Sequence, residues 1–227
     1  MAGFFTHEWI ANLVLQKLMS KQFLSNFENS DDYFFGAIAP DIRYITQSPR
    51  DVTHKPFGND SLFEALKAST TSTPFVAGYE THLITDMAWS NDKNWLNQSI
   101  YERYDINPND SAKKFALYWL VDDYFQAEAD SFFPLACAGN ILRANDNGIL
   151  LKLGVKNNDI LFYKSLLAAY FREPGINTFT KFSFVPNNLD EVLIRNILDK
   201  KTDLMNFLKE FKNAAVEKCI SSLERYI

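Results

Sequence analysis

The sequence contains few residues of the kinds that build disulfide-rich, membrane-spanning or nucleic-acid-binding proteins. Two cysteines in 227 residues are too few for a disulfide framework or a cysteine-based zinc site, so we expect Cys137 and Cys219 to be buried thiols in a reducing cytoplasm. No apolar run reaches about 18 residues, which argues against a transmembrane helix. Lys+Arg 23 against Asp+Glu 28 gives a net charge of −5, so we expect no broad nucleic-acid interface.

The first residues are apolar, but they lack the features of a signal peptide. No basic segment precedes them, and His7, Glu8 and Asn12 interrupt the apolar stretch. We therefore predict a cytoplasmic location.

Apolar residues make up 47% of the sequence and aromatic residues 15%, which excludes a disordered chain. Apolar positions recur with the helical period of 3.6 residues in most segments. The pattern predicts an all-α, single-domain, multi-helix bundle over residues 1–227. The main helices are expected at about 7–19, 31–39, 61–68, 74–89, 93–104, 111–138, 159–171 and 188–227, with a break near 200–202.

Two stretches do not follow this pattern. Residues 41–59 contain Pro49, Pro56 and Gly58 among polar residues, which indicates an irregular surface loop, and loops of this length are usually functional. Residues 178–184 alternate loosely and are expected to be extended.

The segment Pro74–Trp89 carries the clearest chemical pattern. In a helix, Gly78, His82 and Asp86 fall four residues apart on one stripe, so an imidazole and a carboxylate can point at one ion. The absence of a side chain at Gly78 leaves space there for a further ligand or a substrate.

The sequence contains 3 histidines, and each lies beside features that a metal site needs. His7 opens the first helix, His54 lies in the loop after Asp41, and His82 precedes Asp86 by one turn. Imidazole and carboxylate ligands together suit zinc, or manganese or iron. Singly, each residue also fits an ordinary role: a polar group at a helix end, a solvated loop residue, a loop cap at Asp41, or a partner of His82 at Asp86.

Together these motifs resemble the zinc-dependent phospholipase C family, which is all-α and related to single-strand-specific zinc nucleases. The resemblance covers about the first 90 residues and rests on Thr6–His7, GAIAPDI at 36–42, Thr53–His54 and GYETHLITD at 78–86. It implies that Asp41, His54, His82 and Asp86 bind one metal ion. It also implies that Asp86 bridges toward a neighbouring ion held by His7.

The resemblance implies a metal-dependent hydrolase of phosphoesters, with Asp41 as the general base. Its substrate would be a small phosphoester or a lipid headgroup, and Arg43 and Lys55 lie where they could neutralise the phosphate. Two alternatives stay open: a non-catalytic metal-binding regulatory protein with a reduced site, and an HD-type phosphohydrolase. The latter needs an adjacent His-Asp pair, which none of the histidines forms.

The family's remaining metal is held by two later histidines and a glutamate, and this chain has no histidine after His82. That site therefore cannot be built in the family's way, so we expect one or two ions. Asp122 and Asp123 are the better candidates for replacement ligands. The other candidates are Asp92, Glu128 and Asp130.

Overall fold

The computed structural model describes residues 3–20, 30–54, 73–89, 100–107, 109–146, 148–182, 185–186, 191–199 and 201–224. Within these ranges the regular structure is helical and contains no strand, so the fold is all-α, as the sequence predicted. The predicted helix at 61–68 and most of the one at 93–104 lie outside these ranges. The longer helices are α1 (Phe4–Ser20), α2 (Ser30–Ile38), α6 (Thr73–Trp89), α8 (Ser111–Glu128), α9 (Phe133–Arg143), α11 (Asn157–Arg172), α13 (Glu191–Asp199) and α14 (Lys201–Leu223).

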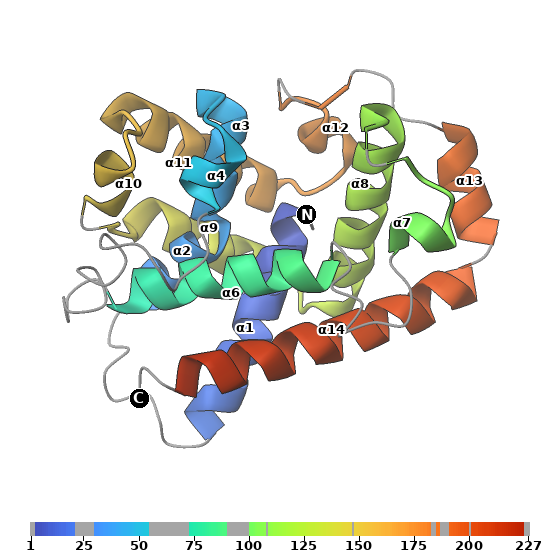
Figure 1. The fold of residues 1–227 in the computed structure, drawn as a ribbon, viewed down its shortest axis with the longest axis horizontal. Coiled ribbons are helices and arrows are strands. Elements are labelled where there is room, and N and C mark those ends of the chain that lie inside the picture. Colours follow the sequence, from blue (N-terminus) through green and yellow to red (C-terminus); the bar gives the residue numbers. More distant parts are fainter. Residues whose placement is uncertain are drawn as a thin grey trace.

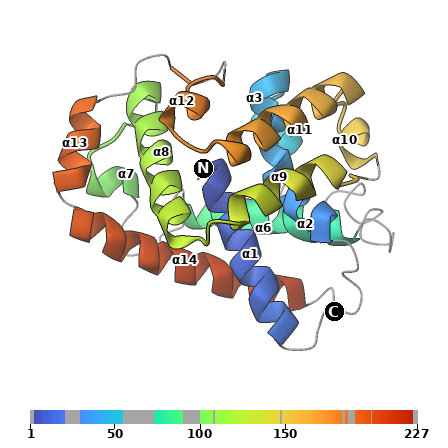
Figure 2. The ribbon, with the colours of Figure 1, turned by 180° about the vertical axis from the view of Figure 1, so that it is seen from behind.

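Helix α6 lies at the centre of the arrangement (Figure 1). Helix α2 packs on it most extensively, α14 runs alongside it, and α1 crosses it. Seen from behind, α9 and α11 lie side by side next to α2 (Figure 2). Because α6 contacts helices from both ends of the sequence, nearly all its side chains are buried, including those of polar residues. Polar side chains on α6 are therefore held in fixed positions inside the protein.

Two glycines allow α2 and α6 to approach closely. A Cβ atom added to Gly78 would lie 1.9 Å from the carbonyl oxygen of Tyr33, and one added to Gly36 would lie 2.2 Å from that of Phe75. Neither position could hold a side chain without moving the two helices apart. The expectation of open space at Gly78 is wrong, since the backbone of α2 fills that space.

The single helix predicted over residues 111–138 is two helices in the structure. The helix expected over 111–138 ends at Glu128 and restarts at Phe133, because the Asp130 carboxylate accepts hydrogen bonds from the backbone N–H groups of Phe132 and Phe133. Pro134, which lacks an N–H group, fits the first turn of the new helix but not the interior of a longer one.

The stretch expected to be extended begins instead in helix α12 (Ile176–Phe179) and continues as turns to Phe182. The C-terminal break is confirmed between α13 and α14. Cys137 and Cys219 are both free and buried.

The stretch after α2 is not an irregular loop as far as residue 54. It consists of short helical turns: η1 (Ala39–Ile42), α3 (Arg43–Thr46) and α4 (Arg50–Thr53). The remaining short helices are α7 (Ile100–Arg103) and α10 (Ile149–Lys152). None of the helices in the described ranges is both long and apolar enough to cross a membrane.

The start of α1 is tied to the rest of the protein by one buried acid. The Asp122 carboxylate on α8 accepts hydrogen bonds from the backbone N–H groups of Phe5 (3.1 Å) and Thr6 (2.9 Å). It also accepts from the hydroxyls of Thr6 and Tyr170. The first N–H groups of a helix have no partner within the helix, so a carboxylate at this end satisfies them and complements the helix dipole. Asp122 thereby fixes the turn of α1 that carries His7.

Candidate metal centre

Four donor atoms from three segments converge in the interior. His82 and Asp86 come from consecutive turns of α6, Asp41 from η1 and His54 from the residue that follows α4. The Nε2 atoms of the two histidines lie 3.3 Å apart. From His54 Nε2, the distances are 3.5 Å to Asp86 Oδ2 and 3.7 Å to Asp41 Oδ1. From His82 Nε2, they are 3.8 Å to Asp41 Oδ1 and 3.9 Å to Asp86 Oδ2.

These separations have the size of the edges of a metal coordination tetrahedron. A tetrahedral zinc ion with bonds of about 2.0–2.2 Å keeps its ligand atoms about 3.3–3.6 Å apart. Each histidine nitrogen is therefore close enough to both carboxylates to share an ion with either. The donor set also suits a metal, because neutral imidazoles and carboxylates are the nitrogen and oxygen ligands that zinc prefers.

His82 is oriented by the helix that packs on α6. Its Nδ1 lies 2.8 Å from the carbonyl oxygen of Ala37 on α2. Since a carbonyl only accepts, Nδ1 carries the proton and Nε2 presents its lone pair to the cluster. Burial, followed by the neighbouring His7, lowers the pKa of His82 well below its usual value, so the ring is neutral at pH 7. A neutral ring with a free Nε2 is the form that binds metal.

His54 is held from two sides. Tyr79 on α6 donates a hydrogen bond to the carbonyl oxygen of Thr53, which fixes the end of α4. The Thr53 hydroxyl lies 3.0 Å from His54 Nδ1, so its oxygen can accept a hydrogen bond from a protonated Nδ1 when Nε2 acts as a ligand. Burial lowers the pKa of His54 as well, which keeps this imidazole neutral.

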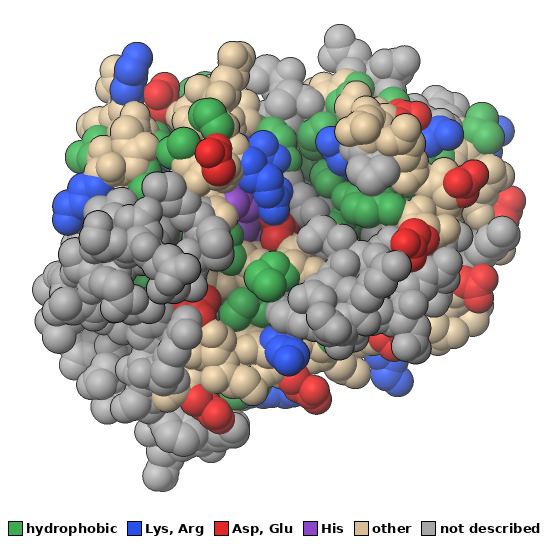
Figure 3. Space-filling model, viewed as in Figure 1, with side chains coloured by type: hydrophobic (Ala, Val, Ile, Leu, Met, Phe, Trp, Pro, Cys, Tyr) green, Lys and Arg blue, Asp and Glu red, His purple; other side chains and the backbone are tan. Residues whose placement is uncertain are grey.

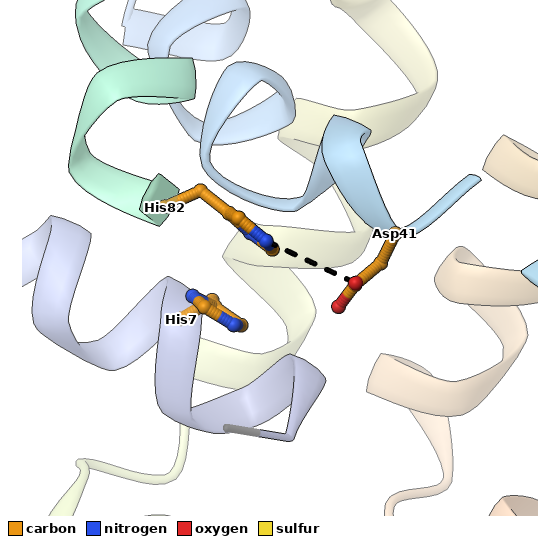
Figure 4. Close-up of side chains that lie close together, drawn as sticks. All are labelled: His7, Asp41 and His82. Carbon is orange, nitrogen blue, oxygen red and sulfur yellow. Dashed lines mark ion pairs between the residues drawn. The ribbon is translucent and has the colours of Figure 1, made fainter. Parts of the chain in front are cut away.

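Asp86 faces two groups of donors. Its Oδ2 belongs to the four-atom cluster, whereas its Oδ1 lies 3.5 Å from His7 Nε2. The His7 ring stacks on that of His82, with ring centroids 3.8 Å apart (Figure 4). Burial by itself raises the pKa of the Asp86 carboxyl, but the adjacent imidazoles of His54 and His7 help to hold it well below its usual range. Asp86 is therefore ionised and placed between two positions for a cation.

Several buried polar atoms in this cluster have no hydrogen-bond partner in the described part of the chain. They are both ring nitrogens of His7 and both carboxylate oxygens of Asp41. An unpaired buried polar atom costs about 1–3 kcal/mol, and an unpaired charge costs more. A bound cation would satisfy the Asp41 carboxylate and the ring nitrogen of His7 that carries the lone pair, so the residues fit a metal.

Arg50 was not predicted as part of the site. Its Nη2 donates to Asp86 Oδ2 at 2.7 Å, and its side chain is half exposed at the edge of the cluster. Arg50 precedes His54 by four residues, and the backbone N–H of His54 donates to the Arg50 carbonyl oxygen. Had residues 50–54 been predicted as a helical turn, this i, i+4 relation would have placed Arg50 beside the ligands.

The candidate replacement ligands lie elsewhere. Asp122 is saturated by its hydrogen bonds at the start of α1, and Asp123 is exposed. Among the described residues, the groups able to hold a metal are His7–Asp41–His82 and His54–His82–Asp86, and neither includes these two acids. We therefore no longer assign Asp122 and Asp123 to a metal. Lys55 and Asp92 lie outside the described residues.

The space-filling view shows how the cluster meets the surface. A histidine surface is visible in a hollow bordered by Lys or Arg, acidic and hydrophobic side chains (Figure 3). The side chains of Asp41, His54, His82 and Asp86 are all almost wholly buried, whereas that of Arg50 is half exposed, so Arg50 marks the side on which the cluster meets the surface.

A model of the family described as zinc dependent phospholipase C matches residues 6–131 of the chain. The match covers more than half of the sequence and spans every donor in the cluster, so the chain belongs to the zinc-dependent phospholipase C family. Comparisons with curated proteins and with solved structures gave no match.

Acid is expected to destabilise the metal-free protein through His82. Its pKa is lowered in the folded state, so below about pH 6.5 the unfolded chain takes up a proton that the folded chain does not. The free energy of unfolding should then fall by up to about 1.4 kcal/mol per pH unit from this group. Asp41 has a raised pKa and contributes in the opposite direction as the pH falls toward 4.

Urea denaturation of chelator-treated protein between pH 7.5 and 5.0 measures this effect, with His82→Gln as the reference. The variant should lose stability less steeply below pH 6.5, since it lacks one proton-binding group. Equal slopes for the two proteins would contradict the assignment.

Proposed function

We propose that this protein is a metal-dependent phosphoesterase whose primary ion is held by Asp41, His54, His82 and Asp86. The observation that carries the proposal is the convergence of two imidazole nitrogens and two carboxylate oxygens, all buried, in a chain of the zinc-dependent phospholipase C family: each Nε2 lies 3.3–3.9 Å from the other three donor atoms. We further propose the position between His7 Nε2 and Asp86 Oδ1 for a second ion. Zinc suits these ligands best, with manganese or iron as alternatives.

When bound, such an ion lowers the pKa of its water to about 7 and polarises phosphoryl oxygens. We assign Asp41 as the general base that takes the proton of the attacking water. Burial raises the pKa of the Asp41 carboxyl, and the neighbouring charge of Asp86 raises it further. A carboxylate with a raised pKa accepts a proton more readily near neutral pH.

Arg43 is the proposed substrate-binding cation. It follows Asp41 by two residues, lies on α3 and is partly exposed. Its Nη2 donates to the Tyr44 hydroxyl at 2.7 Å, and its guanidinium lies 4.2 Å from the centre of the Tyr44 ring. This stacking leads the guanidinium along the edge of the site, where a planar donor can bind phosphate oxygens. Lys55, the other predicted cation, stays a prediction.

A second candidate is a protein that binds metal without turnover. The absence of histidine after His82 favours it, because the family's remaining metal cannot be ligated in the usual way. The HD-type alternative has no such support, since none of the histidines is followed by aspartate.

The test is to quantify metal per chain and then to measure hydrolysis of p-nitrophenyl phosphate and bis-p-nitrophenyl phosphate. We expect near-stoichiometric metal, with activity that is lost on chelation and restored by zinc. In Asp41→Asn an oxygen ligand remains but the base is lost, so the rate should fall about 100- to 10,000-fold while metal is retained at saturating concentration.

Each alternative has its own signature. Stoichiometric metal without hydrolysis of either ester would favour the non-catalytic protein. Folded protein that binds no metal would refute both. An Asp41→Asn variant with full activity would remove the general base from Asp41 and leave the metal site standing.

A further inference from the structure

Helix α8 forms a wall beside the metal cluster. The sequence alone did not indicate that any residue of α8 could bind a substrate. Tyr118 on α8 shares a hydrogen bond with Tyr101 at 2.8 Å, and its ring meets edge to face that of Trp89, three residues after Asp86 on α6, with 6.0 Å between the ring centres. Lys114 lies one turn before Tyr118 and therefore on the same side of α8. This face of α8 therefore lies beside the end of α6 that follows Asp86, with Lys114 nearer the start of α8.

Ring contacts connect Lys114 with Arg43 across the space between α8 and α3. The Lys114 ammonium lies 5.6 Å from the centre of the Phe115 ring. The Phe115 ring meets that of Tyr44 edge to face at 6.4 Å, and Tyr44 carries the Arg43 guanidinium on its own face. Each of the two touching aromatic rings therefore carries one cation, Lys114 on α8 and Arg43 on α3.

The surroundings of Lys114 disfavour its positive charge, and a bound anion would relieve this. Within the described residues the Lys114 ammonium has no carboxylate partner, and burial together with the charge of Arg43 lowers its pKa. On the facing wall, burial raises the pKa of the Tyr44 hydroxyl, and the negative charges of Asp41 and Asp86 raise it further. Both belong to the metal cluster, so a bound divalent cation would balance their charge. The Lys114 ammonium, on the opposite wall from the Arg43 guanidinium, would then have no described acid to balance its charge.

We infer that Lys114 and Arg43 form a two-walled anion site that selects phosphoesters carrying at least two negative charges and no cationic headgroup. The inference rests on the proposed function, because it places this site beside the scissile phosphate. A phosphomonoester dianion meets the condition, and so does a phosphodiester with a second acidic group. A zwitterionic headgroup such as phosphocholine would bring its ammonium group against Lys114 or Arg43.

Calorimetric titration with inorganic phosphate, glycerol 2-phosphate and phosphocholine at pH 8 tests the inference without relying on turnover. Phosphate should bind at least about tenfold more tightly than phosphocholine, since a charge-assisted hydrogen bond is lost when a cationic group intrudes. Lys114→Gln should weaken phosphate binding about tenfold for the same reason, and Lys114→Arg should retain it. Lys113→Gln makes the same charge change one residue earlier and should bind phosphate as the wild type does.

A further ligand distinguishes whether the two negative charges come from one phosphomonoester or from a diester with a second phosphate. Tighter binding of glycerol 2-phosphate identifies a phosphomonoester site, whereas tighter binding of glycerophosphoinositol 4-phosphate identifies a diester with a second phosphate. Equal binding of phosphate and phosphocholine would overturn the inference.

Metal content distinguishes failure of this inference from failure of the proposed function. If the protein holds stoichiometric metal but Lys114→Gln binds phosphate as the wild type does, the anion site is refuted and the phosphoesterase proposal stands. If chelator-treated and zinc-supplemented proteins both lack metal, yet phosphate binding still depends on Lys114, the proposed function is refuted and the anion site stands.

Discussion

His82→Ala is expected to abolish stoichiometric metal binding and, with it, phosphoester hydrolysis. His82 contributes the Nε2 atom that lies within 3.3–3.9 Å of three other donors, and its Nδ1 is anchored on the Ala37 carbonyl. Loss of an outer hydrogen bond to a metal ligand typically weakens metal binding 10- to 100-fold, so removal of the ligand itself should cost more than about 100-fold. Elemental analysis after gel filtration measures the loss.

The matched control lies one turn further along α6. Thr85 is buried like His82, but its hydroxyl donates to the Thr81 carbonyl of its own helix. Thr85→Ala should therefore keep its metal and cost only about 1 kcal/mol in the free energy of unfolding. If His82→Ala kept its metal, or if both variants lost it, His82 would not be a specific ligand.

Gly78→Ala is expected to destabilise the protein by about 3 kcal/mol or more, although it touches no donor. In an ordinary helix this substitution stabilises by about 1 kcal/mol. Here the new Cβ would lie 1.9 Å from the Tyr33 carbonyl oxygen and 2.9 Å from the Ala37 nitrogen. These are backbone atoms, so α2 and α6 must separate. Urea denaturation measures the change in stability.

Separation of α2 and α6 would also disturb the metal cluster, because α2 orients the His82 ring. Ala37, which orients His82, is one of the residues that the new methyl group would displace. We therefore expect metal affinity in Gly78→Ala to fall about 10- to 100-fold, as for loss of an outer hydrogen bond. The control is Gly139→Ala on α9, whose Cβ would meet only the flexible end of Arg143 at 3.0 Å. That variant should stay within about 1 kcal/mol of the wild type. Equal stability of the two variants would contradict this account of the helix contact.

The parts of the site that lie close together in sequence could be predicted from it. The helical period placed His82 and Asp86 on one stripe of α6, and that arrangement depends only on the local geometry of one helix. The all-α class followed in the same way from apolar periodicity. The assignment of a single domain and a cytoplasmic location stay predictions.

The parts that depend on contacts between distant segments could not be predicted. Space was expected at Gly78 because nothing in the sequence of α6 shows that the backbone of α2 packs against it. The contacting residue, Tyr33, lies 45 residues earlier in the sequence. Asp122 looked like a metal ligand because an aspartate on an apolar helix suits either a metal or a helix end. Only the fold brings Thr6 to it. Arg50 was missed because the prolines in residues 41–59 led to the prediction of a loop, whereas residues 50–53 form a helical turn.

The hydrogen bonds of Asp122 bear on how such centres can be identified in other sequences. All of the proposed donors lie between residues 7 and 86, yet the turn that carries His7 is held by an acid 116 residues after Thr6, with a tyrosine on α11 completing the contact. A sequence that preserved every donor but placed an apolar residue where Asp122 stands would match the motif and still lose the anchor of its first histidine. An acid at this position is therefore as useful a marker of an intact centre as any single ligand, and surveys limited to the N-terminal motifs would overlook it.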